Sequence, residues 1–202
     1  EYPDEERLDA ENQYVMPGNI CAHTHFYGAF SRGLGIPGDP ATNFTEILDK
    51  LWWNLDKALD EEGSRYSALV CLVDAVKHGT TTLIDHHASP NAIDGSLDII
   101  AETVNQAGLR ASLCYEVTDR DGPEKAEQGL QENLRFIGRI QKREPEDVNL
   151  RAHFGLHAGL TLSDKTLARA NELCPSGIGF HIHAAQGVSR IFFRLKTSCI
   201  RV

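Results

Sequence analysis

Two histidines, His23 and His25, stand one residue apart at the end of the apolar segment VMPGNICAHTH, residues 15–25. Side chains at positions i and i+2 of a β-strand point to the same face, so we expect both imidazoles to project together from the strand end. They would stand about 6–7 Å apart, a spacing at which two neutral imidazoles can reach one metal ion. Histidine pairs also arise by chance on surfaces, so the case for a metal site depends on the rest of the chain.

Other residues that could do chemistry also lie where predicted strands end. These residues are Asp85, His86, His87, Glu116, His157, His181 and His183. Seven of the nine histidines occupy such positions, an arrangement that random placement would not favour. In a β/α barrel the carboxyl ends of the strands meet at one mouth, where active sites are built. We therefore expect these side chains to gather at one site.

The strands that would position these residues alternate with helices. Strand-like runs cover residues 15–25, 80–88, 109–117, 148–158 and 177–185, and helical patterns cover 44–60, 62–78, 95–107, 123–143 and 163–173. This alternation predicts a parallel sheet with right-handed crossovers, either an open doubly wound sheet or a β/α barrel. No glycine-rich phosphate loop follows the first strand, which disfavours a dinucleotide-binding fold.

Composition and charge restrict the partners of the chain. Of its 202 residues, 41% are hydrophobic, and its net charge of −9 argues against nucleic acid or an anionic membrane as a partner. No apolar run of ~18 residues occurs, so we expect no transmembrane helix. The five cysteines are scattered and include no C-x-x-C pair, which predicts free thiols in a reducing, cytoplasmic location.

Four motifs in order resemble the strand signatures of the amidohydrolase superfamily. VMPGNICAHTH resembles its first barrel strand, where Pro-Gly precedes a metal-binding H-x-H pair, and GTTTLIDHHASP (79–90) resembles the second. FGLHAGLTLSD (154–164) resembles the fourth strand of the deaminase and chlorohydrolase branch, and GFHIHAAQG (179–187) resembles the fifth. With the segments NFTEILDKLWW and SLCYEVTDRDG, the resemblance is greatest to SsnA-type aminohydrolases and spans residues 1–187.

The resemblance implies an α/β fold, a partial TIM-like (β/α) barrel over residues 15–187 that covers about the first five strands. Residues 1–14 would be a remnant of a small N-terminal β-domain. Residues 188–202 hold four basic residues and no acidic one, so we expect an atypical basic tail that a frameshift would explain. The chain would be a fragment of roughly half its parent, because a complete barrel has eight strands. Its open barrel would expose two strand edges and an apolar lumen, which predicts self-association.

The resemblance also implies a metal centre. Carried over to this chain, His23, His25 and His183 would bind one divalent metal ion, with zinc as the first choice and iron as the second. No lysine ends the fourth strand where it could bridge two metal ions, because Lys165 lies well inside the next helix. A mononuclear site is therefore expected.

Further residues would bind substrate or support the metal ligands. The resemblance assigns His157, and less specifically Glu46, to contact with a small heterocyclic substrate. We expect at most one of His86 and His87 to face the mouth, and His181 to lie on the face opposite to His183. The candidates that would pack against or hydrogen-bond the metal ligands are Asp85, His86, His87 and His181.

The implied reaction is hydrolysis of a carbon–nitrogen bond other than a peptide bond, with deamination of an amino-substituted heterocycle as the leading case. The metal ion would lower the pKa of a bound water from ~15.7 toward ~7, and the hydroxide would attack a ring carbon. The family places a catalytic carboxylate three residues after its fifth-strand histidine, but this chain has Gln186, which cannot carry a proton. Losing a general acid–base typically costs ~10²–10⁴-fold in rate.

Two alternatives stay open beside deamination. Gln186 and the absence of the last three strands favour a catalytically incompetent fragment that only binds metal. The chain could instead belong to a cyclic-amide hydrolase or a chlorohydrolase of the same superfamily.

Overall fold

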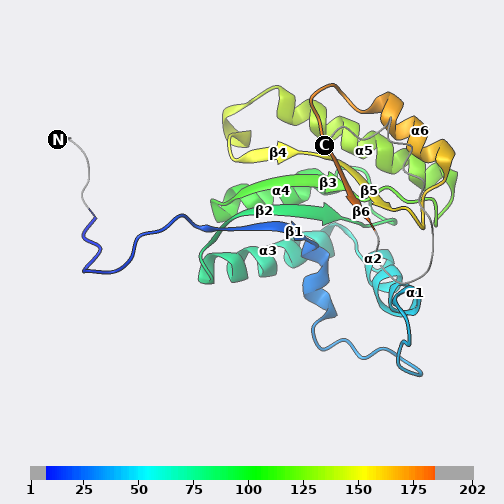
Figure 1. The fold of residues 1–202 in the computed structure, drawn as a ribbon, viewed down its shortest axis with the longest axis horizontal. Helices are drawn as coiled ribbons and strands as arrows, with labels where there is room; N and C mark the ends of the chain where they lie inside the picture. Colours follow the sequence, from blue (N-terminus) through cyan, green and yellow to red (C-terminus); the bar gives the residue numbers. More distant parts are fainter. Residues whose placement is uncertain (1–7, 185–202) are drawn as a thin grey trace.

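The computed structural model describes residues 8–184 and shows strands alternating with helices (Figure 1). The strands of this part are β1 (Asn19–Thr24), β2 (Thr80–His87), β3 (Arg110–Tyr115), β4 (Leu150–Ala152), β5 (Phe154–Ala158) and β6 (Phe180–His183). Strands β1 to β4 form one sheet in chain order, β5 and β6 form a second, and every pairing is parallel. The predicted α/β class and parallel pairing are confirmed, whereas the partial barrel stays a prediction.

The strands are connected by four long helices. They are α3 (Glu61–Lys77), α4 (Ser96–Ala107), α5 (Pro123–Gln141) and α6 (Asp164–Leu173), all within a residue or two of the predicted ranges. Asp60 and Ser163 cap α3 and α6, because their side chains accept hydrogen bonds from backbone N–H groups in the first turn. Gly108 ends α4 in the left-handed conformation, with φ of 69°, which glycine adopts without steric cost.

The strand predicted over residues 148–158 is divided at His153 into β4 and β5. Strand β4 pairs with β3, whereas β5 pairs with β6. The His157 N–H still donates to the Val117 carbonyl at 2.8 Å, and the His153 N–H donates to the Leu113 carbonyl at 3.2 Å. These two bonds hold β5 beside the end of β3, so the two sheets follow one another around a curve.

Asn133 on α5 occupies the point where the two sheets separate. Its Oδ1 accepts from the backbone N–H groups of Tyr115 at 2.9 Å and Gly155 at 3.1 Å, and its Nδ2 donates to the Tyr115 carbonyl at 2.8 Å. A Cβ atom on Gly155 would lie 2.2 Å from that same carbonyl oxygen, so only glycine allows the strands to approach this closely. A buried amide thus replaces the missing strand pairing.

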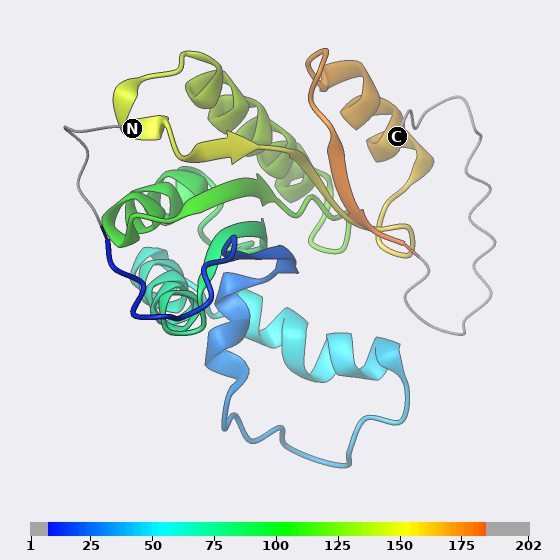
Figure 2. The same ribbon diagram turned by 60° about the vertical axis from the view of Figure 1, so that its left-hand side comes forward.

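The helix predicted over residues 44–60 is three consecutive segments. These are α1 (Phe44–Ile47), the π-helical η2 (Leu48–Trp52) and α2 (Trp53–Lys57). The short 3₁₀ helices η1 (Phe26–Ser31) and η3 (Pro145–Asp147) complete the described elements. Figure 2 shows α1 and α2 at the end of a long loop, on the side of the molecule away from β4.

The main hydrophobic core fills the space between the four-stranded sheet and helices α3 and α4. Its fully buried members come from η1, these two helices, β3, β4 and α5, and include Phe26, Leu72, Leu97, Ile100, Val104, Leu113, Phe136 and Leu150. Burying one such side chain contributes about 1.5–3 kcal/mol. This packing fixes the sheet, and the sheet fixes the strand ends that carry the polar residues.

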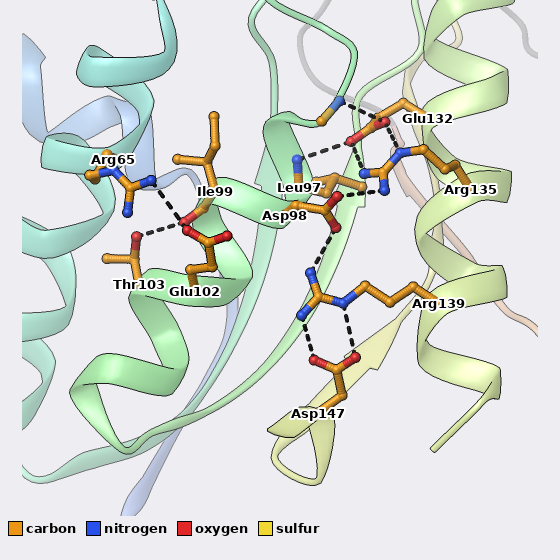
Figure 3. A network of polar contacts seen from close by, with 11 residues as sticks. Arg65, Leu97, Asp98, Ile99, Glu102, Thr103, Glu132, Arg135, Arg139 and Asp147 are labelled. Carbon is orange, nitrogen blue, oxygen red and sulfur yellow. Dashed lines mark hydrogen bonds and ion pairs between the residues drawn. The ribbon is translucent and has the colours of Figure 1, made fainter. Parts of the chain in front are cut away.

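A polar network joins α4 to α5 at the edge of this core (Figure 3). Buried Glu132 accepts from the backbone N–H groups of Gly95 at 3.1 Å and Leu97 at 3.0 Å, and so caps the first turn of α4. Arg135 and Arg139 both donate to Asp98 on α4, at 2.6 and 2.8 Å. Gly95 precedes α4 and has no side chain that could cap the helix, so Glu132 of α5 accepts these hydrogen bonds instead.

Some predictions fall outside the described part of the chain. Residues 1–7 and 185–202, which include Gln186 and the basic tail 188–202, lie outside it. Residues 8–18 are exposed and form no strand, so the expected remnant of a small β-domain stays a prediction. Across residues 8–184, none of the helices combines the length and apolar character needed to cross a membrane.

Candidate metal centre

Histidines from β1 and β6 meet where these strands end. His23 lies within β1, His25 directly follows its last residue, and His183 is the last residue of β6. Strand β6 reaches β1 across the curve of the sheets rather than by backbone pairing, so only the tertiary fold brings these side chains together. The structure therefore groups the three residues that the sequence predicted as metal ligands.

The three imidazoles present the same nitrogen to a common point. The Nε2 atom of His183 lies 3.1 Å from Nε2 of His23 and 3.2 Å from Nε2 of His25. A tetrahedral zinc ion with Zn–N bonds of 2.0–2.1 Å holds its ligand nitrogens about 3.3 Å apart. The two separations from His183 are thus close to those that one zinc ion requires, and one ring nitrogen of each residue lies within 4.8 Å of the others, so the donor set fits the metal.

The protonation state of His25 suits a metal ligand. Its Nδ1 lies 2.7 Å from the backbone carbonyl oxygen of His86, which can only accept, so Nδ1 carries the proton. Burial lowers the pKa of His25 to about 3, so the ring is neutral at pH 7. The Nε2 atom then offers its lone pair to the common point, and the carbonyl fixes the orientation of the ring.

His181 lies beside His23, and its predicted position is wrong. Its Nε2 lies 2.8 Å from Nδ1 of His23, and the two rings stack with centroids 5.0 Å apart. His183 also contacts His23, so both β6 histidines face the same cluster. The physical reason is the strand period of two, which places residues 181 and 183 on one face.

Only His86 of the two adjacent histidines on β2 faces this cluster, as predicted. Its ring centroid lies 4.7 Å from that of His181 and 4.8 Å from that of His183. The ring is fully buried, and neither nitrogen has a hydrogen-bond partner within residues 8–184. His87 points away and contacts the Ser89 hydroxyl at 3.0 Å.

A buried carboxylate, Glu116 at the end of β3, lies against the same cluster. Its Oε1 is 3.0 Å from Nε2 of His157 and 3.9 Å from Nδ1 of His183, and its Oε2 is 3.6 Å from Nδ1 of His25. Burial raises the pKa of Glu116 to about 8 and lowers that of His157 to about 3. Sequence reasoning noted its strand-end position but gave it no role, because its partners come from other strands.

The other predicted residues lie nearby in different roles. Asp85 is buried, and its Oδ1 accepts from the Phe26 N–H at 2.7 Å, so it anchors the chain directly after His25. Glu46 accepts from the Thr42 N–H at 2.9 Å and from Asn43 Nδ2 at 2.9 Å, which is a helix-capping arrangement. Its contact with substrate stays a prediction.

A hollow beside His25 offers room for a small molecule. It has a volume of about 300 Å³ and is lined by residues of η1, η2 and α3, among them Gly28, Trp52, Cys71 and Asp74. The indole of Trp52 lies with its ring centroid 6.5 Å from that of His25.

The sequence of the chain matches a family model described as the amidohydrolase family over residues 14–191. The chain belongs to this family. Among curated amidohydrolase relatives, it is 29% identical over 180 residues to 5'-deoxyadenosine deaminase from Methanosarcina mazei, a match that covers 89% of this chain and 39% of that protein. The chain thus spans about two fifths of the length of this relative.

Two solved structures of deaminases share the fold of this chain. Guanine deaminase from C. acetobutylicum, with guanine bound in its active site, has a TM-score of 0.69 at 15% identity and covers 85% of this chain and 40% of its own. An adenosine deaminase from Xanthomonas campestris, solved with bound zinc, has a TM-score of 0.65 at 20% identity, covering 83% and 36%. The neighbours of the chain are therefore hydrolytic enzymes, and one of them holds zinc.

Proposed function

We propose that this chain carries the metal-binding part of a hydrolase that removes an amino group from a heterocycle, with adenosine-like purines as the leading substrate class. The convergence of three Nε2 atoms from His23, His25 and His183 carries the proposal. The substrate class is supported by the relative named 5'-deoxyadenosine deaminase. Zinc is the preferred metal and ferrous iron the second choice, since three neutral imidazoles suit both.

Each residue of the chain has a separate task in this proposal. A metal ion bound by the three histidines would supply a water of lowered pKa, close to ~7, as the nucleophile. His157 would lie against the substrate ring, and Glu116 and the Thr161 hydroxyl, which engage its two ring nitrogens at 3.0 and 2.5 Å, would fix its orientation. The indole of Trp52 would stack on the heterocycle in the hollow beside His25.

The buried surroundings of the histidines favour metal binding at neutral pH. Burial lowers the pKa of His183 to about 4, as it lowers that of His25 to about 3, so no proton competes for the ligand nitrogens near pH 7.

The four cysteines in the described part are free thiols, which supports a reducing compartment such as the cytoplasm.

Metal analysis of the purified chain tests the proposal. We expect tightly bound zinc or iron, with one ion fewer in His183→Ala and in His25→Ala than in the wild type. His78→Ala, which replaces an exposed histidine at the end of α3, should hold as much metal as the wild type. Ammonia release from 5'-deoxyadenosine, adenosine and guanine is measured on the same samples. Absence of bound metal in the wild type, or a metal content in both ligand variants equal to that of the wild type, would falsify the metal centre.

A second candidate function is metal binding without turnover. Gln186 favours it, because an amide cannot carry a proton between the nucleophile and the leaving group. The variant Gln186→Glu separates the two functions: a gain of about 10²–10⁴-fold in ammonia release indicates a metal site that lacks only its acid–base group. Chloride release from a chlorotriazine, or opening of a cyclic amide, in place of ammonia release would identify the corresponding family branch.

A further inference from the structure

His23 belongs to a second group of three histidines, which it forms with His86 and His181. Nδ1 of His23 lies 2.8 Å from Nε2 of His181, and the fully buried His86 stands against both rings. One nitrogen from each of the three residues lies within 4.8 Å of the others. These residues come from β1, β2 and β6, so they belong to three separate strands.

His86 distinguishes this group from a simple hydrogen-bonded pair. Both of its ring nitrogens are buried, and neither has a partner within residues 8–184. Leaving one buried polar group without a partner costs about 1–3 kcal/mol, so an imidazole with two such atoms indicates a missing ligand. No carboxylate belongs to the group, and a metal ion bound there would have only nitrogen ligands from the protein.

We propose that the chain binds a second divalent metal ion between Nδ1 of His23, His86 and His181, next to the His23–His25–His183 centre and at the same time as the first ion. An all-imidazole ligand set favours Zn²⁺, Co²⁺, Ni²⁺ or Cu²⁺ over Mg²⁺ and Ca²⁺, which prefer oxygen. His23 faces both sites, with Nε2 toward the first and Nδ1 toward the second. With both ions bound, His23 would hold the first with Nε2 and the second with Nδ1, which requires loss of its one ring proton to solvent.

The carboxyl of Glu116 belongs with His25 and His86 to a separate group of possible ligands and not to this one. The proposed reaction uses no group of the second site except His23, and the inference rests on the first centre because both sites share this residue.

Metal stoichiometry of the full 202-residue chain tests the proposal. The chelator-treated protein is titrated with Zn²⁺ by isothermal calorimetry, and bound zinc is then counted by mass spectrometry after dialysis. We expect two zinc ions per chain in the wild type and one in His181→Ala and in His86→Gln. His183→Ala should also bind one, now at the second site, and His78→Ala should still bind two.

The variants distinguish failure of this site from failure of the first one. One zinc ion in the wild type that His183→Ala loses and His181→Ala keeps overturns the second site and leaves the first standing. Two zinc ions in both His181→Ala and His86→Gln also overturn it. Because His86 is buried, circular dichroism melting checks that His86→Gln folds, and the half-buried His181 provides a variant that leaves the core intact.

Discussion

The Nε2 atom of His157 lies 3.0 Å from Oε1 of Glu116, so the ends of β5 and β3 are joined by a buried contact beside the histidine cluster. The other ring nitrogen of His157 contacts the Thr161 hydroxyl at 2.5 Å. Both ring nitrogens are thus engaged, and the ring is fixed in one orientation. Glu116 is 4% exposed, so nothing in solvent can replace it as the partner of His157.

Replacing Glu116 should therefore destabilise the chain in a way that depends on the new side chain. Glu116→Ala leaves Nε2 of His157 buried without a partner, which should lower the free energy of unfolding by about 1–3 kcal/mol. Glu116→Gln keeps polar side-chain atoms at the same place, so it should lower the free energy of unfolding by less than Glu116→Ala does. Urea unfolding of the metal-free variants at pH 7 measures both changes, and equal losses in the two variants would contradict a role for the hydrogen bond.

Asp85 should make the stability of the metal-free chain depend on pH. Burial raises the pKa of its carboxyl to about 7 from an ordinary value of 3.8, although the Phe26 N–H donates to it. The folded state holds the Asp85 proton more tightly than the unfolded chain does. The stabilisation that the protonated carboxyl provides is therefore complete below about pH 3.8, and it is lost as the pH rises to about 7.

The matched variants of Asp85 separate its charge from its hydrogen bond. Asp85→Asn keeps an oxygen for the Phe26 N–H but cannot ionise, so its unfolding free energy should exceed that of the wild type increasingly between pH 4 and pH 7. Asp85→Ala loses the acceptor and should be less stable than Asp85→Asn at every pH. Urea unfolding at several pH values provides the test, and parallel wild-type and Asp85→Asn curves would refute the charge effect.

Short-range periodicity in the sequence predicts two of the proposed metal ligands. His23 and His25 are i and i+2 on one strand, and the long helices were predicted because their apolar repeats and caps are local. His183 was added by resemblance, and the structure brings its Nε2 to 3.1 Å from that of His23. Its position depends on how far the sheets curve, which no local pattern shows.

What the sequence could not predict depends on contacts between distant segments. The division of the fourth strand at His153 follows from the close approach of Gly155 to the Tyr115 carbonyl and from the Asn133 amide, which is 18 residues from Tyr115 and 22 from Gly155. The position of Glu116 against His157 likewise depends on the pairing of two strands. The misplaced His181 is different, since the period of two was available in the sequence.

Asn133 should be among the most sensitive positions outside the histidine cluster. Its Oδ1 is the acceptor for two buried N–H groups, those of Tyr115 and Gly155, and the residue is fully buried. Asn133→Ala should lower the free energy of unfolding by about 3 kcal/mol, since both donors lose their partner. Gln131→Ala, an exposed position on the same helix, is the control and should change it by no more than about 0.5 kcal/mol. Similar losses in both variants would show that the amide does not join the sheets.

The two free sheet edges should make the isolated chain self-associate. Within residues 8–184, β1 pairs only with β2 and β6 pairs only with β5, so each presents unpaired backbone groups on its other side. Ile20 on β1 is 68% exposed at one of these edges, and α3 adds exposed Val70 and Val73. Exposed apolar edge strands template pairing with other chains.

Sedimentation velocity of the purified chain measures this association. We expect the average mass to rise with concentration in the wild type and to fall toward that of one chain in Ile20→Lys, because a charge on the edge strand blocks pairing. Val148→Lys is the control, since Val148 is 69% exposed but lies outside both edge strands. A wild type that remains a single chain at all concentrations, or an equal effect of the two lysine variants, would show that the β1 edge is not the contact.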